Sequence, residues 1–192
     1  MVVMQFHLFP LSKIEVMADN YLEKKMEEFR SAPQKSVSKK SKALFKSLLQ
    51  KNRGFALFDS KVVVRESHLN DIILVNEHLS FFGSAANFEF VGAAGEKVAK
   101  VLPYIDAKVV LHGVEQVLDT ESVGAFVVVC ARSLQMTECV DLGISIQSMS
   151  LRATEMGLNG TSLRVADPQG LRDALETNCL PVAVLAIGKG VE

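Results

Sequence analysis

Continuous apolar runs and alternating positions mark the predicted strands of this chain. Residues 124–131 (GAFVVVCA) and 181–188 (PVAVLAIG) are apolar runs of strand length, which predicts central strands covered on both faces. Residues 87–93 alternate apolar and polar side chains, as a half-buried strand does. A short strand is also predicted at 161–165. These segments indicate a sheet with a buried centre.

Helical spacing of apolar residues is clearest between about residues 138 and 156. One stripe there consists of Leu142, Ile146, Met149, Ala153 and Met156, and a second of Val140, Ile144 and Leu151. A helix that is apolar on two sides is buried on two sides, so it is either the central helix of the domain or a dimer interface. Shorter helices are predicted at 12–30, 42–52, 68–78, 96–102 and 168–177. Helices and strands without a strict βαβ rhythm predict an α+β layered domain.

Length and composition narrow the class of protein. A chain of 192 residues with 48% hydrophobic and 22% charged residues is typical of one globular domain, and we assign residues 1–192 to it. Residues 1–43 are interpreted as an N-terminal helix and an exposed linker associated with a dimer. The net charge of −1 argues against a nucleic-acid binder, and no apolar stretch approaches the roughly 20 residues of a membrane span. Three cysteines fit reduced thiols, so we expect a cytoplasmic protein without a membrane partner.

Motifs that carry catalytic chemistry are missing from the sequence. It contains no nucleophile elbow, no zinc-protease motif and no phosphate-binding glycine loop, and its four histidines are scattered. We therefore predict neither a metal site nor a catalytic side chain. Arg53-Gly54 and Gly188-Lys189-Gly190 are weak candidates for anion contacts. The residues by themselves indicate an α+β domain with no visible active site.

The C-terminal third carries a resemblance to a known family. Val140–Gly160 (VDLGISIQSMSLRATEMGLNG) resembles the central helix and glycine turn of the nitroreductase family. Asp167-Pro168 and the strand that leads into Ile187-Gly188 follow in the family's order. Upstream, Asn52–Phe58 lies where the family has its R-S-x-R-x-[FY] segment. The resemblance covers about residues 44–192 and is strongest from 124 onward.

The resemblance implies a fold and an activity. The fold is a three-layer α+β architecture, with a central mixed or antiparallel sheet flanked by helices, in an intertwined homodimer. Family enzymes hold FMN at two sites between the subunits. They pass hydride from NAD(P)H through the flavin to nitroaromatics, quinones or similar small-molecule electron acceptors. No side chain is required as a general acid or base, because hydride passes directly between stacked rings.

The resemblance also implies where the cofactor binds. Arg53 takes the place of a phosphate partner, and Gly54 and Phe55 present backbone to the flavin. Ser84 is the remaining polar donor of a segment that contacts the ring and the ribityl chain. The loop before Asp167 faces the ring in the family. The complete set of candidate cofactor-binding residues is Arg53, Gly54, Phe55, Ser84, Arg164, Val165 and Lys189.

Departures from the family pattern leave two hypotheses open. The second family arginine is replaced by Ala56, and the asparagine and glutamine expected near Ala86 are missing. In the family a tail with basic residues that close on the phosphate usually follows the last strand, whereas this sequence stops at Glu192. The first hypothesis is a divergent FMN-dependent NAD(P)H oxidoreductase. The alternative is a flavin-free binding or scaffold module of the same fold, in which Phe81 and Phe82 fill the vacated ring site.

Overall fold

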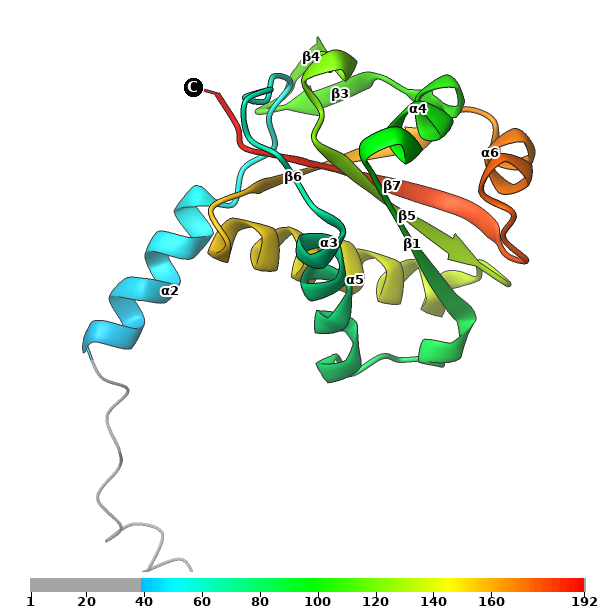
Figure 1. The fold of residues 1–192 in the computed structure, drawn as a ribbon. Coiled ribbons are helices and arrows are strands. Elements are labelled where there is room, and N and C mark those ends of the chain that lie inside the picture. Colours follow the sequence, from blue (N-terminus) through cyan, green and yellow to red (C-terminus); the bar gives the residue numbers. More distant parts are fainter. Residues whose placement is uncertain (1–38, 192) are drawn as a thin grey trace, which may run out of the picture. The chain divides into compact units, whose positions relative to one another are not determined.

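The computed structural model of the chain describes residues 39–191 (Figure 1). Residues 43–192 form a compact unit of their own. The helix predicted at 12–30 and most of the linker lie outside the described residues. Assignment of the whole chain to a single domain therefore stays a prediction.

A five-stranded antiparallel sheet forms the centre of the compact unit, and a separate two-stranded hairpin lies beside it. The four strands predicted from the apolar runs are confirmed to within two residues, whereas the three short strands between residues 105 and 117 were not predicted. The order in the sheet is β1 (Phe88–Ala94), β5 (Ala125–Ala131), β7 (Leu180–Gly188), β6 (Asn159–Val165) and β2 (Ile105–Asp106). The hairpin consists of β3 (Lys108–Leu111) and β4 (Val114–Val117).

Helices cover both faces of this sheet, because successive side chains of its central strands point to opposite sides. Phe126 and Val128 of β5 pack into one core, together with residues of α4 (Val98–Val101) and α6 (Pro168–Leu175). Val127 and Val129 pack into a second core with residues of α3 (Glu66–Leu74) and α5 (Met136–Glu155). The three-layer α+β architecture is therefore confirmed (Figure 1).

The two apolar stripes of α5 have different surroundings. In the stripe that packs against the sheet, Met149 and Ala153 are fully buried, and Leu142, Ile146 and Met156 are partly buried. The other stripe contains Val140, Ile144 and Leu151, and none of these residues belongs to either core cluster. Val140 remains 44% exposed. Within the described part of the chain, α5 is thus the central helix on one side and has an apolar surface on the other.

Helix ends follow local chemistry. The carboxylate of Asp167 accepts a hydrogen bond from the Gly170 N–H at 3.0 Å, so α6 begins as the sequence predicts. Gly157 ends α5 with a φ of 80°, a left-handed conformation that favours glycine. The remaining short elements are α2 (Lys39–Lys51), η1 (Val75–His78), η2 (Ala85–Asn87), η3 (Gly95–Lys97), η4 (Leu102–Tyr104) and η5 (Thr120–Ser122). Across residues 39–191, no helix combines the length and apolar character that crossing a bilayer requires.

Candidate functional site

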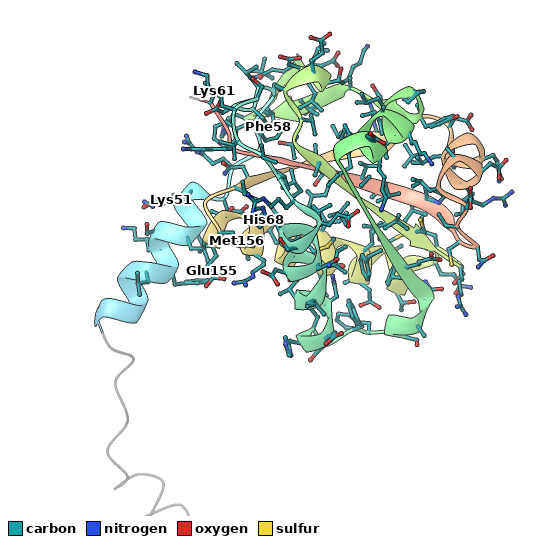
Figure 2. All side chains as sticks on the ribbon, viewed as in Figure 1. Lys51, Phe58, Lys61, His68, Glu155 and Met156 are labelled. Atoms are coloured by element: carbon teal, nitrogen blue, oxygen red, sulfur yellow. The ribbon has the colours of Figure 1, made fainter. Side chains whose placement is uncertain are left out.

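The segment after α2 is attached to the C-terminal end of α5. The side-chain oxygen of Asn52 accepts hydrogen bonds from the hydroxyls of Ser150, at 2.7 Å, and Thr154, at 3.2 Å. The backbone carbonyl of Lys51, the residue before Asn52, accepts a hydrogen bond from the side-chain amide of Asn159 at 3.1 Å. Figure 2 shows Lys51 near Glu155 at this end of α5. These contacts fix the position from which the Arg53 side chain starts.

Two further contacts hold the segment against β6 and the hairpin. The Phe55 N–H donates to the Thr161 hydroxyl, which in turn donates to the Phe55 carbonyl, both at 2.8 Å. A Cβ on Gly54 would lie 2.7 Å from the Cδ2 atom of Leu111 in β3. A larger residue at this position would require the Leu111 side chain to shift. These contacts fix the backbone of Arg53, Gly54 and Phe55 beside β6 and the hairpin.

Lys189 lies between Gly188 and Gly190, and an aromatic ring packs against each of these glycines. A Cβ on Gly190 would lie 2.4 Å from the Phe55 ring, and one on Gly188 would lie 2.7 Å from the ring of Phe58. Neither glycine has a positive φ. The Lys189 carbonyl accepts from the Asp59 N–H at 2.8 Å, and its exposed side chain lines neither cavity described next. The glycines are therefore explained by ring packing rather than by a flexible anion loop.

Two adjoining cavities meet at Arg53. The first, which we call the β6 cleft, has a volume of about 250 Å³ and lies between β6, α5 and β3. The second, the hairpin cavity, has a volume of about 220 Å³ and lies between residues 53–57 and the tip of the β3–β4 hairpin. Arg53, Gly54 and Leu111 line both, and no described lining residue is a carboxylate. The guanidinium of Arg53 lies 5.5 Å from the centroid of the Phe55 ring.

The C-terminal half of β6 is closed by another strand of the same chain. Residues 105–106 of β2 pair with Arg164 and Val165 in antiparallel register. The guanidinium of Arg164 also contacts the Asp106 carboxylate at 2.7 Å. The pKa of Asp106 is lowered, first by the hydrogen bond from the Lys108 N–H and further by the charge of Arg164. Arg164 and Val165 are therefore engaged within the chain.

The loop that follows β6 donates its backbone hydrogen bonds to a single carbonyl. The N–H groups of Ala166 and Asp167 both point to the Tyr104 carbonyl, at 2.8 and 3.3 Å. The Tyr104 ring packs so closely on α6 that a Cβ on Gly170 would lie 2.5 Å from it. These two donors are consequently satisfied by the protein itself.

Ser84 lies at the opposite end of α5 from Arg53. The buried carboxylate of Asp141 accepts one hydrogen bond on each oxygen, from the Phe82 and Gly83 N–H groups, both at 2.8 Å. Ser84 follows directly, is exposed, and accepts a hydrogen bond from the N–H of Ala86 at 3.3 Å. The helical rise from Asp141 to Ser150 is roughly 13 Å. One chain therefore does not bring Ser84 and Arg53 together.

Solved structures provide the comparison that decides the fold. A nitroreductase-family protein from Clostridium novyi NT has a TM-score of 0.61 at 16% identity, over 77% of this chain and 86% of that chain. An FMN-dependent nitroreductase from Clostridium difficile has a TM-score of 0.58 at 15% identity, over 76% and 87%. A putative NAD(P)H:FMN oxidoreductase from Staphylococcus epidermidis has a TM-score of 0.60 at 11% identity, over 77% and 87%. This chain has the nitroreductase fold.

The comparison confirms the resemblance seen in the sequence at the level of the fold. At 11–16% identity, these structures establish the architecture and not the activity. No family model and no curated protein matches the sequence. The departures from the family pattern at Ala56 and Ala86 agree with this low sequence identity to the solved nitroreductase structures.

Sequence reasoning missed three polar side chains that organise this nitroreductase fold. Asp141 lies in the motif that carries the resemblance but was given no role. Asn52 and Asn159 were passed over, yet each joins segments far apart in the chain. The signal available for Asp141 was its position beside the apolar stripes of α5, which predicts that its carboxylate is buried. A buried charge requires hydrogen-bond partners. Within residues 39–191, no three His, Cys, Asp or Glu side chains are close enough to hold a metal ion.

Proposed function

We propose that this chain is a nitroreductase-like oxidoreductase that binds FMN and passes hydride from NAD(P)H to a small-molecule acceptor such as a nitroaromatic or a quinone. The observation that carries the proposal is the β6 cleft. It runs along β6 residues that have no partner strand on that side, contains Arg53, and has no carboxylate among its described lining residues. The fold adds support, because two of the structures that share it are described as acting with FMN.

The lining residues fit a flavin nucleotide in chemistry and in size. Arg53 offers a charged fork for a phosphate, and Gln147 and Ser162 offer polar contacts along the cleft. Val109 and Ile146 provide apolar walls for a ring. Each cavity is slightly smaller than the roughly 300–1,000 Å³ of typical ligand sites, but the two adjoin at Arg53. Bound FMN would supply the redox chemistry, while these residues orient the nucleotide and balance its charge.

The proposal includes a homodimer in which each site is completed by the second chain. Val140, Ile144 and Leu151 repeat at helical spacing on the outward side of α5, where no core cluster includes them. Burial of such a stripe against a second copy removes apolar surface from water. The separation of Ser84 from Arg53 supports the same arrangement, since a second copy is then the natural source of the contacts made by Ser84.

A flavin-free protein of the same fold is the second candidate. The observation that favours it is the closed half of β6. There the N–H groups of Ala166 and Asp167 donate to Tyr104, and Arg164 and Val165 pair with β2. In the family this loop faces the flavin ring, so a ring placed there would lose these backbone donors. Phe82 does not fill a ring site within this chain, because its side chain is 76% exposed.

A visible absorption spectrum separates the two candidates. The purified protein is loaded with FMN, passed through gel filtration and examined for a flavin band that NADH or NADPH bleaches. We expect a retained band in the wild type and an affinity on the order of tenfold weaker in Arg53→Ala. Arg172→Ala is the matched control, since it removes the same charge from α6. Absence of any retained flavin would reject the oxidoreductase proposal in favour of the flavin-free candidate.

A further inference from the structure

The hairpin cavity is lined by three polar side chains among mostly apolar residues. Arg53 comes from the segment that runs to Leu57, and His112 and Gln116 come from the hairpin. Its volume of about 220 Å³ is roughly seven times the 30 Å³ that one water molecule occupies in the liquid. The cavity is therefore large enough for a tetrahedral anion and part of the group that carries it.

The turn of the hairpin determines where the imidazole lies. His112 has a φ of 52° and the following Gly113 has a φ of 80°, so both residues of this two-residue turn are left-handed. Such turns match the twist of the flanking strands. Histidine is among the non-glycine residues that adopt this conformation more readily than most. The imidazole is thus attached to a tight turn, and His112 lines the same cavity as Arg53.

Strand register places Gln116 on the cavity side and the charged pair on the other side. Gln116 lies opposite Val109, a buried residue, whereas Glu115 lies opposite the exposed Val110. Glu115 forms an ion pair with Lys108 at 3.6 Å. Successive side chains of a strand alternate between its two faces, so Gln116 points away from this carboxylate.

The carboxylate of Asp119, which follows the hairpin, is bound within its own turn. None of the described residues that line the hairpin cavity is acidic. The Asp119 backbone N–H donates to the Ala56 carbonyl at 2.8 Å, but its carboxylate accepts from the Glu121 N–H at 3.2 Å. The lining therefore combines a guanidinium, an imidazole and a side-chain amide, all of which donate hydrogen bonds.

We propose that the hairpin cavity binds a phosphate monoester through Arg53, His112 and Gln116. Guanidinium groups bind phosphate oxygens with two parallel hydrogen bonds, and an imidazole N–H and an amide N–H can occupy the remaining oxygens. On the proposed function, which this step rests on, the ester is the 5′-phosphate of FMN. Inorganic phosphate offers the same chemistry without the flavin.

The test compares FMN with riboflavin, which lacks the phosphate. Dissociation constants for both are measured by flavin fluorescence for the wild type, His112→Ala and Gln116→Ala. Val117→Ala is the control, because Val117 lies in the same hairpin on the side away from Gln116, is 69% exposed and does not line the cavity. We expect His112→Ala to weaken FMN about tenfold and Gln116→Ala by a few fold, with riboflavin changed less than about twofold. Inorganic phosphate should compete with FMN in the wild type.

The outcomes separate failure of this inference from failure of the proposed function. Equal losses for FMN and riboflavin in His112→Ala, or no loss for either, would overturn the phosphate site while flavin binding stands. If neither flavin binds the wild type, the proposed function fails, and line broadening of inorganic phosphate in ³¹P NMR then decides the inference. Broadening that disappears in His112→Ala supports the site, and the absence of broadening in the wild type rejects it.

Discussion

The two ends of α5 hold two candidate site segments by different means. At the N-terminal end, a fully buried carboxylate, Asp141, accepts two backbone hydrogen bonds from the loop that leads to Ser84. At the C-terminal end, the hydroxyls of Ser150 and Thr154 donate to Asn52, which precedes Arg53. One end uses a fully buried charge, and the other uses neutral groups at a partly exposed site.

This difference shows how the site is divided. Both segments are fixed to the same rigid helix, so neither Ser84 nor Arg53 can move toward the other without breaking these contacts. A second copy is the proposed source of one of the two segments for a ligand that contacts both. The second apolar stripe of α5, in which Val140 is 44% exposed, is the surface through which that copy would join.

The largest effect is expected from a charge placed on the stripe between the two ends. We expect Val140→Glu to raise the dimer dissociation constant at least a hundredfold, because an unpaired charge buried in an interface costs about 3–5 kcal/mol. Light scattering at micromolar concentration measures the change. Gln169→Glu, on the exposed side of α6, is the control and should leave the dimer intact. A wild type that is itself monomeric would contradict the dimer proposal.

Loss of the Asp141 carboxylate is expected to have the second-largest effect. In Asp141→Asn one carboxylate oxygen becomes an NH₂ group that faces a backbone N–H, so one hydrogen bond to a charged group is lost and a donor is left without an acceptor. We expect the free energy of unfolding to fall by about 2–3 kcal/mol, measured by urea denaturation. Glu138→Gln is the control one helical turn earlier, and its exposed hydrogen bond to Thr137 should contribute less than about 1 kcal/mol. Similar losses in both variants would show that burial of the carboxylate is not the cause.

The pH dependence of stability at alkaline pH tests the burial of the Cys130 thiol, which lies in β5 before the N-terminal end of α5. Burial raises the pKa of the Cys130 thiol to about 11, from an ordinary value of 9.0. Because the folded state favours the protonated thiol, its contribution is complete below the ordinary pKa and is lost as the pH rises toward 11. We expect a loss of about 2 kcal/mol at pH 11 relative to pH 7 that is absent in Cys130→Ala. Cys139→Ala, which changes an exposed thiol, should keep the wild-type slope.

Loss of the Asn52 side chain is expected to change stability least. Asn52→Ala removes the acceptor of the Ser150 hydroxyl, whereas the Thr154 hydroxyl keeps the Ser150 carbonyl as an alternative acceptor at 2.9 Å. We expect the free energy of unfolding to fall by about 1 kcal/mol in urea denaturation. Asn178→Ala, at an exposed position, should change it by less than about 0.5 kcal/mol. A loss as large as that of Asp141→Asn would erase the distinction between the two ends.

Most of the architecture follows from patterns in the sequence, whereas the hairpin does not. Buried strands such as β5 and β7 are apolar at almost every position, so their place in the sheet can be recognised without tertiary information. The short strands β2, β3 and β4 carry mixed side chains, and all four residues of β4 are exposed. The turn His112-Gly113 was the available signal, but histidine is not among the usual residues of such turns.

The candidate site was only partly predictable, because its members are joined by tertiary contacts. Arg53, Gly54 and Phe55 are adjacent in sequence and stay together in the fold. The engagement of Arg164 with Asp106, and of Ala166 with Tyr104, depends on pairing between segments about 60 residues apart, which no local pattern reports. Binding of FMN, use of NAD(P)H and a cytoplasmic location stay predictions.

The position of β7 has a consequence for how the chain acquires its structure. β7 is the last strand among the described residues, yet it lies in the middle of the sheet and pairs with both β5 and β6. Neither β5 nor β6 has its shared neighbour until residues 180–188 pair between them. Because the pairing of β5 with β7 joins segments far apart in sequence, folding of this sheet is expected to be slow, and the unpaired edges of β5 and β6 are prone to aggregation until β7 is in place.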